Sequence, residues 1–312
     1  MHSTTTHGLH HITAISSDIS RNLHFYTKVL GLRFVKQSVN QDDPGTYHLY
    51  YGDYLGSPGT CLTFFPWAGL KRGRPGTGQA YATGFAVPLG SLDFWQQRFA
   101  QMNIKHLPRE NRFTDEVLPF FDPDDLRLEL IATSETDLRS PAPSEDVPLE
   151  NAIRGFHSTT LALLSTAATA TVLTDSMGYR LIAQAGYRTR YTVDQGGPGT
   201  YVDLLTDPNL PRGLNGSGTI HHVAFRANDD ANQSAARTVL VASGLAVSPV
   251  IDRAYFKSIY YREPGGVLFE IATDQPGFTI DESPTTLGTR LSLPPHLEPH
   301  RTAIQAALPK LI

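Results

Sequence analysis

The chain has 312 residues, of which 40% are hydrophobic, and its formal net charge is −4. This length and hydrophobic content suit two domains of ordinary size and argue against wholesale disorder. Because the charge is small and no block of Lys and Arg occurs, the sequence argues against nucleic acid and anionic membrane as partners. Cys61 is the only cysteine, which excludes an internal disulfide and favours a reducing compartment.

The chain shows neither a membrane span nor a leader. No apolar run approaches the roughly 20 residues that are needed to cross a bilayer. The first residues, Met1 to His7, are polar, and no basic stretch leads into an apolar one, so we predict no signal peptide. We therefore expect a cytoplasmic protein, and the sequence leaves open whether it is a monomer or a homo-oligomer.

Three short β-like phrases in the chain resemble one another. They read Gly-Leu-His-His-Ile-Thr-Ala-Ile at 8–15, Gly-Phe-His-Ser-Thr-Thr-Leu at 155–161 and Thr-Ile-His-His-Val-Ala-Phe at 219–225. A helix start signal follows each phrase at a fixed distance, at Asp18, Ser165 and Asp229. The side-chain oxygens of these residues can accept the free N–H groups of a first helical turn. The repeat predicts a strand followed by a helix at each place.

Other phrases recur as well. Residues 122–133 and 263–273 each contain a Pro turn followed by a strand with one Glu, and the phrase Pro-Gly-Thr-Tyr occurs at 44–47 and at 198–201. We interpret the chain as four similar units, each a strand, a helix and two or three further strands. These units cover 8–65, 80–133, 155–206 and 217–273.

The predicted class is α+β with two domains. The first domain comprises residues 1–140 and the second comprises residues 151–280, and each holds two of the four units. Residues 134–150 are rich in Ser, Pro and acidic residues, which is typical of a linker. Residues 281–312 form a Pro-rich C-terminal tail, in which Arg301 to Leu308 are predicted to form a last helix.

A metal site follows from the repeat and from the alternation of side chains along a strand. His222 should point away from the face of Val223, and Glu270 away from the face of Phe269, so both should face the concave side of a sheet. The repeat makes His11 the partner of His222. Two imidazoles and one carboxylate with open positions suit non-haem Fe(II), with Mn(II) or another divalent metal as an alternative.

The other two units lack such a set. Ser158 occupies the ligand position of the third unit, and Glu129 matches Glu270 without any His partner. We therefore predict that Glu129 is structural and pairs with a nearby Arg. For His48, in the phrase Tyr-His-Leu-Tyr, the ordinary interpretation, a strand-surface or core histidine, is preferred.

Beyond these patterns, the sequence resembles the hydroquinone ring-cleaving dioxygenases of the vicinal-oxygen-chelate superfamily, which also includes glyoxalases, bleomycin resistance proteins and extradiol dioxygenases. The resemblance covers nearly the whole chain. Its motifs are Leu-His-His-Ile-Thr at 9–13, Arg-Phe-Val-Lys at 33–36, Tyr-His-Leu-Tyr-Tyr at 47–51, Leu-Gly-Ser-Pro-Gly-Thr at 55–60, Arg-Gly-Phe-His-Ser at 154–158, Ile-His-His at 220–222 and the segment 260–270.

The resemblance implies four βαβββ modules that are paired into two vicinal-oxygen-chelate domains, with metal ligands from the first and last modules. It also implies roles beside the metal or the substrate for His10, Thr13, His221, Arg253 and Tyr260. Strand alternation supports Thr13, which shares a face with His11. It places His10 and His221 on the opposite face, away from the metal, and it leaves Tyr260 undecided.

The leading hypothesis is an Fe(II)-dependent dioxygenase that opens the ring of a hydroquinone-like or catechol-like aromatic diol with O2. Tyr260 and a nearby His would move protons, and Arg253 would hold developing negative charge. One alternative is a glyoxalase-type isomerase or lyase that uses Zn(II) or Ni(II), which generally needs a second carboxylate as base. Another is a non-catalytic quinone-binding or drug-binding resistance protein, which would need no complete set of metal ligands.

Overall fold

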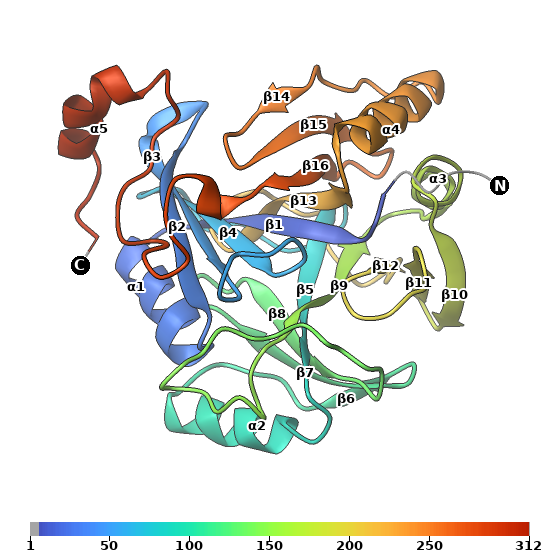
Figure 1. Cartoon of the computed structure of the whole chain (residues 1–312). Helices are drawn as coiled ribbons and strands as arrows, with labels where there is room; N and C mark the ends of the chain where they lie inside the picture. The colour runs from blue at the N-terminus through green and yellow to red at the C-terminus, as the bar shows by residue number, and fades with distance from the viewer. Residues whose placement is uncertain (1–5, 312) are drawn as a thin grey trace.

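The computed structural model describes residues 6–311, and Figure 1 shows its arrangement. Most of the polar opening, on which the prediction of no signal peptide depends, lies outside this range. Among the described residues, no helix has the length and apolar character needed to cross a bilayer. The described chain contains two eight-stranded sheets with a few short helices around them.

The first sheet carries the predicted metal ligands. Its eight strands, in sheet order, are β14 (Ile251–Asp252), β15 (Phe256–Arg262), β16 (Leu268–Pro276), β13 (Thr219–Ala227), β1 (Leu9–Ser16), β4 (Cys61–Pro66), β3 (Asp43–Gly52) and β2 (Arg33–Asn40). In the middle of this sheet β1 pairs antiparallel with β13, while β4 and β16 lie parallel to β1 and β13 respectively. The three ligand-bearing strands β1, β13 and β16 are therefore neighbours.

The second sheet repeats this plan. Its strands, in sheet order, are β10 (Arg180–Ala185), β11 (Arg188–Thr192), β12 (Tyr201–Leu205), β9 (Gly155–Ala162), β5 (Gln79–Val87), β8 (Arg127–Ala132), β7 (Asp115–Phe121) and β6 (Glu110–Arg112). As in the first sheet, the first strands of two modules, here β5 and β9, pair antiparallel at the centre. Each sheet takes one module from either half of the chain: the first and fourth form one sheet, and the second and third form the other.

Helices complete the four modules. They are α1 (Ile19–His24) with the π-helical turn η1 (Phe25–Val29), α2 (Leu92–Gln101), α3 (Ala167–Thr171) with η2 (Val172–Ser176), and α4 (Asp230–Ala242). Every module thus runs strand, helix and three strands, which confirms the α+β class with paired βαβββ modules. The turn η3 (Phe278–Ile280) precedes the tail, and within the tail η4 (Glu298–His300) is followed by the predicted last helix, α5 (Arg301–Ala307), beside β3 in Figure 1.

Two of the three predicted helix caps form. Asp18 accepts a hydrogen bond from Arg21 N, and Asp229 accepts one from Asn232 N. The prediction of Ser165 is wrong, because the cap position of α3 is Thr166. Its backbone is helical rather than extended, and its side chain makes no capping hydrogen bond.

The apolar faces of the strands pack against the helices, so the opposite, polar faces of the strands form the concave side of the sheet. In the fourth module Phe225 and Phe269 are fully buried with Ala236 and Leu240 of α4. Burial of such side chains contributes about 1.5–3 kcal/mol each to folding. This packing fixes which face of β13 and β16 is concave, so His222 and Glu270 are held on the side opposite to α4.

Candidate metal centre

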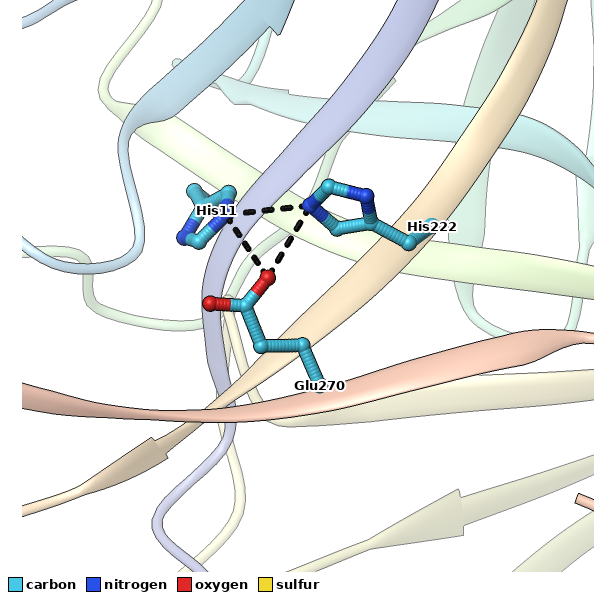
Figure 2. Close-up of side chains that lie close together, drawn as sticks. All are labelled: His11, His222 and Glu270. Carbon is cyan, nitrogen blue, oxygen red and sulfur yellow. Dashed lines mark hydrogen bonds and ion pairs between the residues drawn. The ribbon is translucent and has the colours of Figure 1, made fainter. Parts of the chain in front are cut away.

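The structure brings His11, His222 and Glu270 together, as Figure 2 shows. Glu270 Oε2 lies 3.0 Å from His222 Nε2 and 3.4 Å from His11 Nε2, and the two Nε2 atoms are 3.3 Å apart. All three side chains are buried. They reach this point from β1, β13 and β16, the three adjacent strands at the centre of the first sheet.

The atoms that converge here fit a divalent metal. Glu270 Oε1 accepts a hydrogen bond from Ser258 Oγ at 2.5 Å, whereas Glu270 Oε2 is buried without a hydrogen-bond partner. A buried carboxylate oxygen without a partner is costly, and a cation among these donors would remove that cost. Burial lowers the pKa of His222, so its imidazole is neutral near pH 7, as a metal ligand must be.

The neighbouring histidines fix how the ligand rings are protonated. His10 Nε2 lies 3.1 Å from the carbonyl oxygen of Thr273, which can only accept, so His10 carries its proton on Nε2. Burial and the nearby His11 lower the pKa of His10 to about 3, so its Nδ1 is bare. That Nδ1 is 2.9 Å from His11 Nδ1 and must accept its proton. His11 Nε2 is then left with a free lone pair for a metal.

His221 makes the same contact with the second ligand. Its Nδ1 lies 2.8 Å from His222 Nδ1, and burial, together with the nearby His222, lowers the pKa of His221 to about 3. A neutral His221 can therefore accept the proton of His222 Nδ1, which leaves His222 Nε2 directed at Glu270. Each candidate ligand thus has an outer histidine that orients it.

The alternation argument placed His10 and His221 on the wrong side. The β1–β13 ladder passes from Leu9 to His11 and, on the other strand, from His222 to Ile220, so His10 and His221 are each the extra residue of a β-bulge. A bulge interrupts the alternation of faces and re-aims a side chain, and bulges are frequent beside active sites. Both side chains are consequently turned toward the ligand that follows them.

A cavity of about 300 Å³ opens above the three candidate ligands. Its apolar walls include Phe65, Phe256 and Leu268, and its polar walls include His48, Tyr50, Arg253 and Tyr260. Apolar walls that carry polar groups directed into the cavity are found in small-molecule sites, and polar side chains are the more numerous in this one. The volume suits a single aromatic ring with small substituents.

The remaining predicted residues lie in or beside this cavity. Tyr260 is paired in register with Glu270 across β15 and β16, so it faces the cavity, a point that the sequence had left undecided. Arg253 Nε donates to the Tyr260 hydroxyl at 3.2 Å, and Arg253 Nη2 lies 3.1 Å from Asp42. Thr13 lies behind the cavity wall, where its hydroxyl is 2.7 Å from that of Thr63.

Sequence reasoning missed His48 and Tyr50. Both line the cavity, and the Tyr50 hydroxyl lies 2.7 Å from His48 Nδ1. The motif Tyr-His-Leu-Tyr-Tyr contained them, and alternation places both on the same face of one strand. That shared face was the signal that could have identified them.

The equivalent position in the second sheet holds ion pairs instead. Arg112 contacts Glu129 with Nη1 to Oε2 at 2.5 Å and Nη2 to Oε1 at 2.9 Å. Arg190 pairs with Asp203 at 2.8 Å and with Asp115 at 2.6 Å nearby. The predicted structural role of Glu129 is consistent with this, because a guanidinium occupies the place beside its carboxylate that a metal would need.

We expect Glu129→Gln to lower the free energy of unfolding without changing metal content. Removing one member of a buried ion pair costs about 3 kcal/mol, since the other charge stays buried. Burial alone would raise the pKa of Glu129, but the charge of Arg112 outweighs it and holds that pKa well below its usual value. The stabilisation is then fully present above the unfolded pKa of about 4.3 and is lost progressively as pH falls from there through the lowered pKa of the folded state.

Urea unfolding of wild type and Glu129→Gln at pH 7 and pH 3, with metal analysis at pH 7, measures this effect. The difference in unfolding free energy should be full at pH 7 and smaller at pH 3, where part of the stabilisation is already lost. A difference that does not change with pH, or a loss of metal in the variant, would contradict the structural role.

Comparisons with known proteins agree with this geometry. The Glyoxalase/Bleomycin resistance protein/Dioxygenase superfamily matches the chain over residues 8–130 and 155–271. The Bacillus subtilis (strain 168) protein named "Putative ring-cleaving dioxygenase MhqO" is 45% identical over 97% of this chain and 96% of its own. The Sphingobium indicum protein named "Chlorohydroquinone/hydroquinone 1,2-dioxygenase" is 35% identical over 93% of this chain and 92% of its own.

A solved structure is similar over the full length. The crystal structure of a "putative dioxygenase" from Bacillus subtilis subsp. subtilis str. 168 has a TM-score of 0.94 and 43% identity, with 99% of each chain covered. Glyoxalase I from Zea mays has a TM-score of 0.62 at 14% identity, with 86% of this chain and 92% of that chain covered, which is a likeness of fold alone.

Proposed function

The chain belongs to the Glyoxalase/Bleomycin resistance protein/Dioxygenase superfamily, and we propose that it is a ring-cleaving dioxygenase that uses Fe(II) and O2 to open the ring of a hydroquinone-like diol. The observation that carries this proposal is the buried cluster of His11, His222 and Glu270 beneath a cavity the size of one ring. Relatives at 35% and 45% identity bear the name of ring-cleaving dioxygenases, and one of them is named for hydroquinone.

In this proposal His11 Nε2, His222 Nε2 and Glu270 Oε2 hold the metal. Fe(II), when bound, would supply a Lewis acid with open positions and redox chemistry toward O2 and a phenol. His10 and His221 would keep the two ligand rings in the tautomer that leaves Nε2 free. Mn(II) would fit the same donors, and metal analysis decides between the two.

The cavity walls would orient the ring and handle charge. Phe65, Phe256 and Leu268 would hold an aromatic ring and exclude water. Arg253 can only donate hydrogen bonds, so the Tyr260 oxygen accepts from it, and this contact does not use the Tyr260 proton. The Tyr260 hydroxyl and the fixed charge of Arg253 would thus stabilise negative charge that develops on the substrate.

A glyoxalase-type isomerase is less well supported. Such a reaction generally needs a second carboxylate, and among the described cavity residues the only carboxylates are Glu270 and Asp42. Asp42 is an exposed residue at the cavity mouth and pairs with Arg253, so it is poorly placed to act as a base over a buried metal. A pure binding protein would have no need of the complete buried cluster.

We expect the Fe(II)-loaded protein to consume one O2 for each hydroquinone and to form a ring-opened acid. An oxygen electrode and mass spectrometry, applied to a panel of hydroquinones and catechols, measure this directly. Zn(II) has no accessible redox change. The Zn(II)-loaded protein should therefore bind the same hydroquinones and catechols without oxygen uptake. Activity should fall in air as Fe(II) oxidises and should return with ascorbate and added Fe(II).

The alternatives give different results in the same assay. Equal turnover of a thiol–aldehyde adduct with Zn(II) under nitrogen would refute the dioxygenase and favour the isomerase. Tight binding of a phenol by the metal-loaded protein, with no turnover under oxygen, would favour a resistance protein that sequesters its ligand.

A further inference from the structure

A chain of four polar side chains runs from the cavity wall to the strand behind it, and the proposed function makes no use of any of them. The Tyr50 hydroxyl is 2.7 Å from His48 Nδ1, His48 Nε2 is 2.8 Å from Thr63 Oγ1, and Thr63 Oγ1 is 2.7 Å from Thr13 Oγ1. We call this the Tyr50–Thr13 chain. Its Tyr50 end, with His48, lines the cavity, and its Thr13 end lies on the ligand-bearing strand β1.

The sheet order places this chain across the cavity from Tyr260. Tyr260 lies on β15, next to the Glu270 strand β16, and its ring is 6.0 Å from the ring of His222. His48 and Tyr50 lie on β3, on the other side of the ligand-bearing strands and separated from β1 by β4. The Tyr50 ring contacts Phe278 and Tyr255, at 5.0 and 6.5 Å. Tyr260 is therefore next to a candidate ligand, and Tyr50 lies on the other side of the ligand-bearing strands.

The hydrogen bonds leave one position on Tyr50 open. Both ring nitrogens of His48 are occupied, so its ring is held in a fixed orientation between Tyr50 and Thr63. A neutral His48 has one donor and one acceptor nitrogen. If Nδ1 is bare, Tyr50 donates to it, and the Tyr50 oxygen can accept a further bond. If Nδ1 carries the proton, the Tyr50 oxygen accepts it, and the Tyr50 proton is free to be donated.

We propose that the Tyr50 hydroxyl binds the second oxygen of a 1,4-aromatic diol, and that His48 is a positioning residue that holds Tyr50 for this purpose. The inference rests on the proposed function, because it assumes that the first oxygen lies at the cluster of His11, His222 and Glu270. The second oxygen of a para-diol then lies at the far end of the ring, toward the opposite wall. The second oxygen of an ortho-diol stays beside the first and cannot reach that wall.

The Tyr50–Thr13 chain is thus a selectivity device. A buried hydroxyl that is built to pair with a substrate oxygen discriminates against a ligand without it, because the protein group is then left without a partner. Hydroquinone should bind more tightly than 4-methylphenol, in which a methyl group replaces the second hydroxyl. Catechol should gain nothing from Tyr50.

Calorimetric binding to the Zn(II)-loaded full chain under nitrogen tests this without turnover. Tyr50→Phe should weaken hydroquinone binding about tenfold, the usual loss for one hydrogen bond, and should leave 4-methylphenol and catechol within about twofold. His48→Leu should weaken hydroquinone in the same selective way but by less. Tyr47→Phe, in the same strand but outside the cavity, is the matched control and should change none of the three affinities.

Equal weakening of all three ligands by Tyr50→Phe, or a wild type that binds 4-methylphenol as tightly as hydroquinone, would overturn the inference. Zinc content and thermal unfolding check that the variants fold, and if Tyr50→Phe does not fold, the selective loss in His48→Leu decides. A selective loss of hydroquinone affinity, together with no oxygen uptake by the Fe(II)-loaded protein, would support the role of the Tyr50–Thr13 chain and reject the dioxygenase. Normal oxygen uptake with an unchanged hydroquinone affinity in Tyr50→Phe would do the reverse.

Discussion

His11→Ala, His222→Ala and Glu270→Gln should each lose tight metal binding while the protein stays folded. Each substitution removes one of three donors that lie within 3.0–3.4 Å of one another. Loss of an outer partner of a metal ligand alone typically costs about 10–100-fold in affinity, so loss of a ligand itself should cost at least about 100-fold. Metal analysis after reconstitution with Fe(II) and dialysis under nitrogen gives the stoichiometry.

Two matched variants make this test specific. Glu129→Gln alters the carboxylate at the equivalent position of the second sheet and should retain full metal content, although it is less stable. His10→Phe removes the orienting contact to His11 Nδ1, together with the bond to the Thr273 carbonyl, and should bind metal with intermediate affinity. Stoichiometric metal in any two of the three ligand variants would reject the site, as would equal loss in Glu129→Gln.

These three candidate ligands could be located from sequence because two independent regularities met at them. The repeated His-His phrase related His11 to His222, and the alternation of faces put His222 and Glu270 on the side away from an apolar face. Both regularities are local, and both hold wherever the strand is regular. The ion pair of Glu129 followed from the same reasoning, since a buried carboxylate without histidines needs a cation.

Where the strand is irregular, the same reasoning fails. A bulge adds one residue to one strand, and nothing in the sequence marks His10 or His221 as that residue. The repeat could not help with His48 either, because the Pro-Gly-Thr-Tyr phrase at 198–201 leads into β12, the last strand of its module, whereas the phrase at 44–47 lies in β3, the strand before the last. The contact between Asp42 and Arg253 joins two turns that are far apart in sequence, so only the folded sheet brings them together.

The loss of Tyr260 should lower turnover, whereas the loss of a candidate ligand should lower metal binding. Its hydroxyl accepts from Arg253 Nε, and it faces the cavity next to Glu270. Burial raises the pKa of Tyr260, which keeps the hydroxyl protonated at neutral pH. We therefore expect the group to act as a proton donor or a hydrogen-bond donor and not to hold the metal.

We expect Tyr260→Phe to lower kcat by about 10²–10⁴-fold, the usual loss for a removed acid or base, with full metal content. Tyr261→Phe is the matched control, because its hydroxyl lies 3.2 Å from Met177 Sδ on the opposite face of the same strand. Oxygen uptake at saturating hydroquinone, normalised to bound iron, measures both variants. If the hydroxyl acts in the reaction, kcat falls much more than KM changes, and Tyr261→Phe keeps wild-type turnover. Unchanged kcat in Tyr260→Phe would mean that Tyr260 only packs beside the ring, and Arg253 would then be the one remaining group on that wall to stabilise negative charge.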